Sequence, residues 1–209
     1  MNQMLHNSQH RYISAHRIAG SLGAEIDGAD LSRDLPDEML AEIRGALLDH
    51  LVIFFRNQSL SPERQLAFAR RWGDIHLHPF MEGMPDHPEI LEIVKRPTDK
   101  RNFGGSWHTD QMFSPRPAMG TILYAKQVPS AGGDTMFTNQ YLAYETLSPG
   151  MQRICETLRT VCYGDRHKKY GSSRKEAYAG PTGMKVKDPG DVQTTSVHPL
   201  VRTHPETGR

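Results

Sequence analysis

The feature that most constrains this sequence is the triplet His108-Thr109-Asp110, in which an imidazole and a carboxylate are separated by one residue. On an extended strand, side chains two residues apart point to the same face, whereas on a helix they lie about 200° apart around the axis. Both side chains could therefore bind one metal ion only if this segment is a strand or the end of one. The glycine pair before the triplet and the prolines after it also disfavour a helix.

A His-x-Asp pair supplies two ligands of a common metal site, in which two histidines and one carboxylate occupy one face of the metal. Such a site leaves the other positions open and suits non-haem Fe(II) oxygenases, whereas closed sulfur-rich tetrahedra suit zinc. A zinc-dependent hydrolase, or another cupin-type metalloenzyme that uses bound water, would also accept this pair, so that class stays open here. His108 and Asp110 are therefore candidate metal ligands and catalytic residues. The triplet alone is a weak signal, because roughly 0.7 His-x-Asp triplets are expected by chance in a sequence of this composition.

Length and charge narrow the class of protein. The 209 residues fit one domain with a substantial core, so we predict a single catalytic domain over residues 1–209. The formal net charge is only +1, and the basic residues are dispersed among acids, which disfavours a nucleic-acid partner. The chain has no signal-peptide core and no apolar run of the ~20 residues that span a membrane. We therefore expect a cytoplasmic protein without a membrane partner.

The apolar pattern predicts a mainly β chain with a few peripheral helices. The predicted strands lie within residues 12–31 and over 51–55, 90–94 and 121–128, and the predicted helices cover 36–50, 61–72 and 148–162. Cys155 and Cys162 would then lie about 10.5 Å apart along one helix, too far for a disulfide between them.

Residues 164–196 differ from the rest of the sequence. They contain few large apolar side chains, so ordering this stretch would bury little surface. Long segments of this kind are either lids over active sites or disordered. We predict a mobile lid or loop at 164–196.

Several separate motifs resemble, in order, the taurine dioxygenase / 2,4-dichlorophenoxyacetate dioxygenase family of Fe(II)- and 2-oxoglutarate-dependent enzymes. They are Gly-Ala-Glu-Ile-Asp-Gly-Ala-Asp-Leu at 23–31, Leu-Val-Ile-Phe-Phe-Arg at 51–56, Trp72-Gly73-Asp74 with His76 and His78, Trp107-His108-Thr109-Asp110, Gly132-Gly133-Asp134-Thr135, Tyr144-Glu145-Thr146-Leu147-Ser148, and His198-Pro199-Leu200-Val201-Arg202-Thr203-His204-Pro205. Together they are highly specific and extend over nearly the whole chain. The resemblance implies a double-stranded β-helix, the cupin-like jelly roll, with the metal motif near the mouth of the barrel.

The resemblance also implies the reaction and its cofactors. Enzymes of this family bind Fe(II) and use 2-oxoglutarate as cosubstrate, which O2 converts to succinate and CO2 while a C–H bond of a small organic acid is hydroxylated. Where the hydroxylated carbon bears a heteroatom, the product collapses and the substrate is cleaved. His108 and Asp110 carry over as iron ligands, and Thr135 carries over as the residue that binds the distal carboxylate of 2-oxoglutarate. Without the resemblance, the Gly-Gly-Asp-Thr motif would favour an ordinary β-turn.

Three positions concern the organic substrate. His78 falls where the taurine enzyme places an imidazole on the substrate sulfonate, although a histidine on a loop is more often solvated. Met81 replaces a tyrosine of the taurine enzyme and Gly104 replaces an asparagine, which removes two polar contacts to a small sulfonate. We therefore expect a larger or less polar acid than taurine, such as an alkyl sulfate, a sulfonate or an aryloxyalkanoate.

The family pattern continues beyond the last motif. Family members place a second iron-binding histidine, and an arginine that pairs with 2-oxoglutarate, downstream of the segment that contains His198 and His204. Neither His198 nor His204 is expected to replace the missing iron ligand. The sequence ends directly after this segment, at Arg209. We predict a jelly roll that lacks its C-terminal part. The chain would then be either a piece of a longer protein or a degenerate, non-catalytic relative that needs a partner to complete its barrel. A homo-oligomer is left open.

Overall fold

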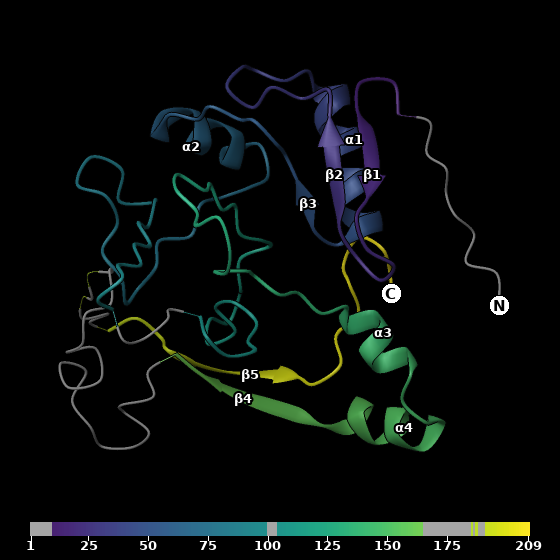
Figure 1. Cartoon of the computed structure of the whole chain (residues 1–209). Coiled ribbons are helices and arrows are strands. Elements are labelled where there is room, and N and C mark those ends of the chain that lie inside the picture. The colour runs from purple at the N-terminus through teal and green to yellow at the C-terminus, as the bar shows by residue number, and fades with distance from the viewer. Residues whose placement is uncertain (1–9, 100–103, 165–184, 186, 188–190) are drawn as a thin grey trace. The chain divides into compact units, whose positions relative to one another are not determined.

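The computed structural model describes residues 10–99, 104–164, 185, 187 and 191–209. The elements of this described part are short (Figure 1). In chain order they are β1 (Ser14–Arg17), β2 (Ala24–Asp27), α1 (Asp37–His50), β3 (Ile53–Phe54), α2 (Pro62–Arg70), α3 (Gln140–Glu145), α4 (Pro149–Thr157), β4 (Arg159–Tyr163) and β5 (Thr195–Pro199). The described residues thus form two small sheets and four helices.

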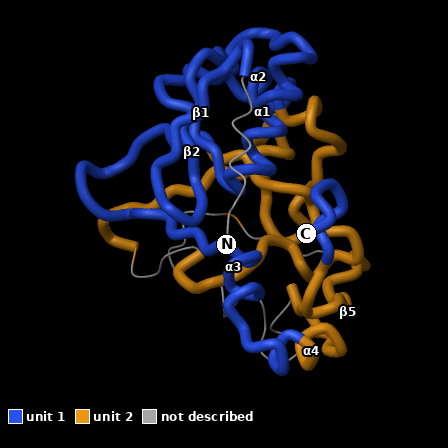
Figure 2. Tube along the Cα trace, turned by 90° about the vertical axis from the view of Figure 1, so that its right-hand side faces the viewer, with its two compact units in different colours: residues 1–68, 124–152, 203–209 blue, residues 69–123, 153–202 orange. Residues whose placement is uncertain are grey.

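The chain divides into two compact units (Figure 2). Unit 1 consists of Met1–Phe68, Tyr124–Gln152 and Thr203–Arg209, and unit 2 of Ala69–Leu123 and Arg153–Arg202. Each unit combines segments that are far apart in the sequence. The single catalytic domain expected over residues 1–209 stays a prediction.

The three-stranded sheet of unit 1 has the order β1-β2-β3. Strands β1 and β2 are antiparallel, whereas β2 and β3 are parallel, with Ala24 opposite Ile53. A parallel pair needs a long crossover connection, and α1 provides it and packs against β2 and β3. The apolar side chains buried in unit 1 are Ile13, Ala24, Ile26, Ala29, Leu31, Ile43, Ala46, Leu60, Leu66 and Phe68.

Both ends of this sheet depend on α1. The Glu42 carboxylate accepts hydrogen bonds from the backbone N–H groups of residues 11–13, which lead into β1, at 2.8, 2.9 and 3.2 Å. Desolvation raises the pKa of Glu42, but the three backbone hydrogen bonds together lower it by a larger amount. The net shift of the pKa is downward. At its other end, α1 is capped by Leu51, which is left-handed (φ 68°) and donates its N–H to the Leu47 carbonyl at 2.7 Å. The strand predicted at 51–55 is therefore confirmed only over Ile53–Phe54.

The two-stranded sheet of unit 2 pairs β4 and β5 antiparallel, with Val161 opposite Val197. The helix predicted through residue 162 is wrong at its end, because α4 stops at Thr157 and residues 159–163 form β4. This run is rich in β-branched and aromatic residues, which favour a strand. Both cysteines are free, as expected, although Cys155 lies in α4 and Cys162 in β4.

Two further predicted strands are wrong within the described chain. Residues 84–90 turn back on themselves, because Met84 donates its N–H to the Ile90 carbonyl at 2.9 Å, and no strand follows over 90–94. Residues 121–128 also form no strand; Leu123 and Val128 are 67% and 71% exposed. Apolar content alone predicted these strands, but a strand also needs a neighbour for its backbone hydrogen bonds.

The loop predicted at 164–196 lies largely outside the described residues, and its last two residues belong to β5. No helix in the described part of the chain is both long and apolar enough to cross a membrane.

Candidate active site

The side chains of His108 and Asp110 face each other in unit 2. The His108 Nε2 atom lies 3.1 Å from Asp110 Oδ1, and both side chains are about half exposed (52% and 56%). The strand expected at this motif is absent: Asp110 begins a turn, and Gln111 is left-handed with a φ of 54°. The turn nevertheless brings imidazole and carboxylate together on one side.

The other nitrogen of His108 fixes the orientation of the ring. Its Nδ1 lies 2.7 Å from the Ser106 carbonyl oxygen, which can only accept a hydrogen bond, so Nδ1 carries a hydrogen. The remaining nitrogen, Nε2, faces the carboxylate. Unless a second proton or a cation lies between them, two lone pairs point at each other there. A backbone carbonyl on the far nitrogen is also the usual partner of a metal-binding histidine.

The carboxylate of Asp110 is oriented in a similar way. Its Oδ2 accepts a hydrogen bond from the Thr121 hydroxyl at 2.9 Å, which leaves Oδ1 turned toward His108. Imidazole nitrogen and carboxylate oxygen are donors that suit Fe(II), and each has its own supporting partner. The two residues therefore fit a metal, although the described residues contain no cluster of three or more His, Cys, Asp or Glu side chains that could hold one.

His198 has a different role from the His108 imidazole. It is buried in β5, and its Nε2 lies 2.9 Å from the Met112 carbonyl oxygen and 3.0 Å from that of Ser114. Since both partners only accept, Nε2 must donate and has no lone pair to offer a metal. This contact is consistent with the expectation that His198 does not replace the missing ligand.

A pocket of about 260 Å³ lies within unit 2. Its lining combines aromatic, apolar and polar groups: His76, Leu77, His78, Pro79, Phe113, Ser114, Lys187, Val192 and Gln193. Five of these nine residues, namely the two histidines, Ser114, Lys187 and Gln193, carry polar side chains, so the wall offers hydrogen-bonding groups and one positive charge beside apolar surface.

His78 is fixed within this pocket. Its Nδ1 accepts the Phe80 backbone N–H at 3.2 Å, so the neutral ring carries its hydrogen on Nε2. The rings of Phe80 and Phe113 stand edge-on to it, with centroids at 6.0 and 6.4 Å. Burial lowers the pKa of His78, as do the charges of His76 and Lys187, and the Asp110 carboxylate opposes them. The lowered pKa favours the neutral form of His78, which can donate a hydrogen bond from Nε2.

The other two predicted substrate residues lie elsewhere in unit 2. Met81 is 5% exposed and does not line the pocket. Gly104 is left-handed (φ 71°), a conformation that glycine and asparagine adopt readily, and a Cβ added there would lie 3.6 Å from the His108 ring. Gly104 is thus next to the candidate ligand, and the substrate roles of both residues stay predictions.

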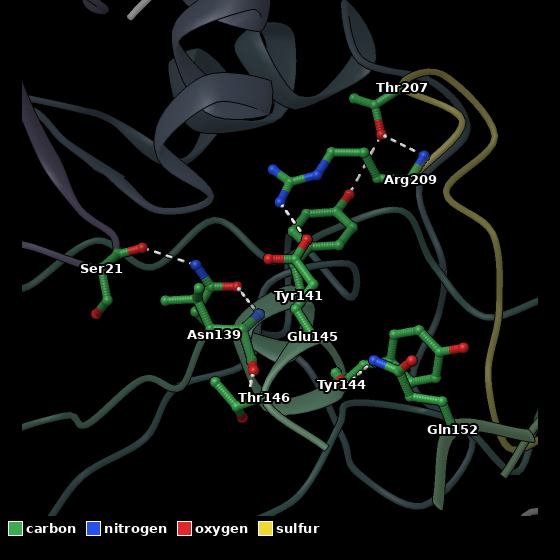
Figure 3. A network of polar contacts seen from close by, with 10 residues as sticks. Ser21, Asn139, Tyr141, Tyr144, Glu145, Thr146, Gln152, Thr207 and Arg209 are labelled. Carbon is green, nitrogen blue, oxygen red and sulfur yellow. Dashed lines mark hydrogen bonds and ion pairs between the residues drawn. The ribbon is translucent and has the colours of Figure 1, made fainter. Parts of the chain in front are cut away.

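Thr135, the predicted 2-oxoglutarate residue, is exposed and lies in unit 1. The chain that follows it is anchored within that unit, since the Phe137 ring stands edge-on to Phe54 with centroids 6.4 Å apart. Figure 3 shows the next anchor: Asn139 accepts the Leu142 N–H at 3.1 Å as the cap of α3 and donates to the Ser21 carbonyl at 2.7 Å. These contacts hold the end of the Thr135 segment on β3 and on the β1–β2 connection.

Several pocket residues were not predicted. His76 could have been found, because it stands two residues before His78 and alternates with it; its Nε2 is buried without a hydrogen-bond partner among the described residues. Lys187 and Gln193 carry no local signal, since they come from the stretch expected to be a lid or loop.

Known proteins resemble this chain over nearly its whole length. The family described as "Taurine catabolism dioxygenase TauD, TfdA family" matches residues 13–209. Pentalenolactone F synthase of Streptomyces avermitilis is 36% identical over 95% of this chain and 70% of its own length. The alpha-ketoglutarate-dependent sulfate ester dioxygenase of Pseudomonas putida is 31% identical over 94% and 64%, and the (S)-phenoxypropionate/alpha-ketoglutarate-dioxygenase of Sphingobium herbicidovorans is 31% identical over 92% and 67%.

Solved structures agree with these relatives. A taurine dioxygenase from Burkholderia xenovorans superposes with a TM-score of 0.71 at 32% identity, covering 94% of this chain and 61% of that one. The chain thus spans between 61% and 70% of the length of these four proteins. The resemblance inferred from the motifs is confirmed, and the chain belongs to the TauD/TfdA family.

Proposed function

We propose that this chain is the larger part of an Fe(II)- and 2-oxoglutarate-dependent dioxygenase that hydroxylates a small organic acid, with cleavage where the hydroxylated carbon bears a heteroatom. The observation that carries the proposal is the geometry of the metal pair. His108 Nε2 and Asp110 Oδ1 are 3.1 Å apart, and each side chain is oriented by a hydrogen bond to its other polar atom. An oriented imidazole–carboxylate pair with open positions suits oxygen chemistry at Fe(II).

His108 and Asp110 would hold the metal, which when bound supplies the activation of O2 that this chemistry requires. Thr135 would bind the distal carboxylate of 2-oxoglutarate with its hydroxyl. The second histidine ligand and the arginine that pairs with the cosubstrate in the family are not assigned to residues of this chain. The proposed fold is accordingly a double-stranded β-helix without its last strands, supported by the TM-score of 0.71 with a taurine dioxygenase.

The pocket beside His78 would bind the organic acid. The hydrogen on His78 Nε2 is available to an anionic oxygen, and the positive charge of Lys187 is close enough to lower the pKa of His78. The rings of Phe80 and Phe113 keep the imidazole in place and make one wall apolar. The named activities of two relatives, on sulfate esters and on (S)-phenoxypropionate, support acids with larger organic groups than taurine.

We also propose that the enzyme is cytoplasmic and that its partners are small molecules and O2, without nucleic acid. The near-neutral charge of the sequence supports this view.

Anaerobic titration with Fe(II) and 2-oxoglutarate tests the proposal. The protein should develop the weak visible charge-transfer band of an iron-bound keto acid, and His108→Ala should not. The titration is made on the 209-residue chain and on the product of any reading frame that continues past Arg209. A zinc-dependent hydrolase or a non-catalytic relative would give no band with either product, which would overturn the proposal.

A further inference from the structure

Strand β5 presents two polar side chains on its buried face. Ser196 and His198 are two residues apart and therefore point the same way, and they are only 7% and 6% exposed. Both reach the turn that begins at Asp110. The Ser196 hydroxyl donates to the Phe113 carbonyl at 2.7 Å, and His198 Nε2 donates to the carbonyls of residues 112 and 114.

Two side chains thus satisfy three consecutive backbone carbonyls. Residues 112–114 are half-buried and do not form a strand with β5, so side chains provide the hydrogen bonds that a ladder would otherwise give. Serine and histidine at these positions therefore fix the turn against the strand from three adjacent points.

The turn connects the metal pair to the pocket. Asp110 stands at its start, and Phe113 and Ser114 line the pocket at its end. The Phe113 ring stands edge-on to those of His78 and Phe80. Any shift of residues 112–114 would move a candidate metal ligand and a pocket wall together.

We propose that Ser196 and His198 are positioning residues that set the turn and thereby couple metal binding to the shape of the substrate pocket. The inference rests on the proposed function of His108 and Asp110. It gives a role to a histidine that neither binds the metal nor lines the pocket.

The test compares His198→Leu, which removes the donor, with His198→Gln, which keeps an N–H at a similar distance from the backbone. Mn(II) affinity without 2-oxoglutarate is read from the fluorescence of Trp107, the neighbour of His108. We expect His198→Leu to weaken Mn(II) binding and to raise the KM for the organic acid, each by about ten-fold, the change expected when the one N–H donor shared by the two carbonyls is lost. His198→Gln should recover most of both.

Hydrogen exchange of the peptide over residues 108–116 adds a readout that needs no metal or activity. Exchange there should be faster in His198→Leu and in Ser196→Ala than in the parent. His204→Leu is the matched control, since His204 lies in unit 1, where its Nδ1 accepts the Glu206 N–H at 3.2 Å. This variant should leave all three measurements unchanged.

Parent-like Mn(II) affinity, KM and exchange in both His198→Leu and Ser196→Ala would overturn the positioning role. If His198→Leu does not fold, the smaller change Ser196→Ala decides by the same measurements. If neither the 209-residue chain nor the product of a longer reading frame binds Mn(II) or 2-oxoglutarate, the proposed function is contradicted instead. The exchange data would still judge the contact between β5 and the turn.

Discussion

The two units of this protein are stabilised in different ways. Unit 1 contains a three-stranded sheet with a 14-residue helix packed on it, and its buried side chains are mainly apolar. In the described part of unit 2, the buried apolar side chains are Phe80 and Met81. Four polar side chains are also buried there: Asp99, Thr194, Ser196 and His198. Unit 2 nevertheless holds the candidate metal pair and the pocket. Because polar contacts rather than apolar packing fix the backbone of unit 2, substitutions there should have a larger effect on the geometry of the site than on the free energy of unfolding.

The metal pair should give the largest effect. His108→Ala and Asp110→Ala should each reduce 2-oxoglutarate consumption by more than ~100-fold, because residues that only hydrogen-bond to a metal ligand already account for about 10–100-fold. Both side chains are half exposed, so the free energy of unfolding should change by less than about 0.5 kcal/mol. Succinate formation and thermal unfolding measure the two quantities. Thr121→Val, which removes the partner of Asp110, should give an intermediate loss, and unchanged succinate formation by either alanine variant would remove the pair from the mechanism.

His78 should affect binding more than turnover. A charge-assisted hydrogen bond to an anion contributes about 1.5–3 kcal/mol, so His78→Ala should raise the apparent substrate constant by roughly ten- to a hundred-fold. Turnover of 2-oxoglutarate without substrate should change much less. His50→Ala in unit 1 is the control and should leave the substrate constant unchanged. Equal loss of coupled and uncoupled turnover in His78→Ala would mean that His78 supports the fold rather than the substrate.

Replacing glycine by alanine should have opposite signs in the two units. In unit 2, a Cβ at Gly164 would lie 2.5 Å from Cγ of Phe113 and 2.8 Å from Cε2 of Phe80, so Gly164→Ala must displace both rings at a cost of about 1–3 kcal/mol. In unit 1, Gly45 lies inside α1, and apart from its chain neighbours and the backbone of its own helix nothing lies within 4 Å of such a Cβ, so Gly45→Ala should stabilise by about 0.5–1 kcal/mol. Denaturant unfolding compares the pair, and a stabilising Gly164→Ala would show that the ring cluster is loosely packed.

The smallest expected effect is on the pH dependence of stability. The pKa values of His78 and His50 are both lowered, mainly by burial, so the unfolded chain binds more protons at these positions than the folded one. Their contribution is present above the ordinary pKa near 6.5 and is lost as pH falls through the lowered folded values. Thermal melts between pH 8 and 5 should show stability falling with pH, less steeply in His78→Gln and in His50→Gln. Slopes identical to the parent in both variants would contradict the assignment.

The sequence predicted the fold best where local pattern and tertiary packing agree. Helix α1 and strands β1 and β2 lie within the predicted segments, because their apolar spacing matches the face that they bury. It predicted least where the backbone depends on distant partners. Residues 121–128 look like a strand, yet Tyr124 is held by its hydroxyl, which lies 3.2 Å from the Gln58 carbonyl and 3.3 Å from the Leu60 N–H.

The site shows the same division. The His-x-Asp spacing indicated that two side chains share a face, and they do so on a turn rather than on a strand. The sequence could not predict that Ser106 and Thr121 are the hydrogen-bond partners of the metal pair, nor that β5 contacts residues 112–114. A periodic pattern of apolar residues does not indicate which polar atom a side chain will reach.

The crossover through α1 also has a kinetic consequence. Strands β1, β2 and β3 and helix α1 lie within Ser14–Phe54, so this part can form while the remainder of the chain is still being synthesised. Strand β5 begins only at Thr195, and the three carbonyls of the turn after Asp110 find their side-chain donors, Ser196 and His198, only when that strand has been made. Pulse-labelling hydrogen exchange during refolding should therefore protect the amides of β2 and α1 first and those of β4 and β5 last. The candidate metal site would be the last feature of this chain to mature, so a partly made chain would not yet hold the metal pair in its final geometry.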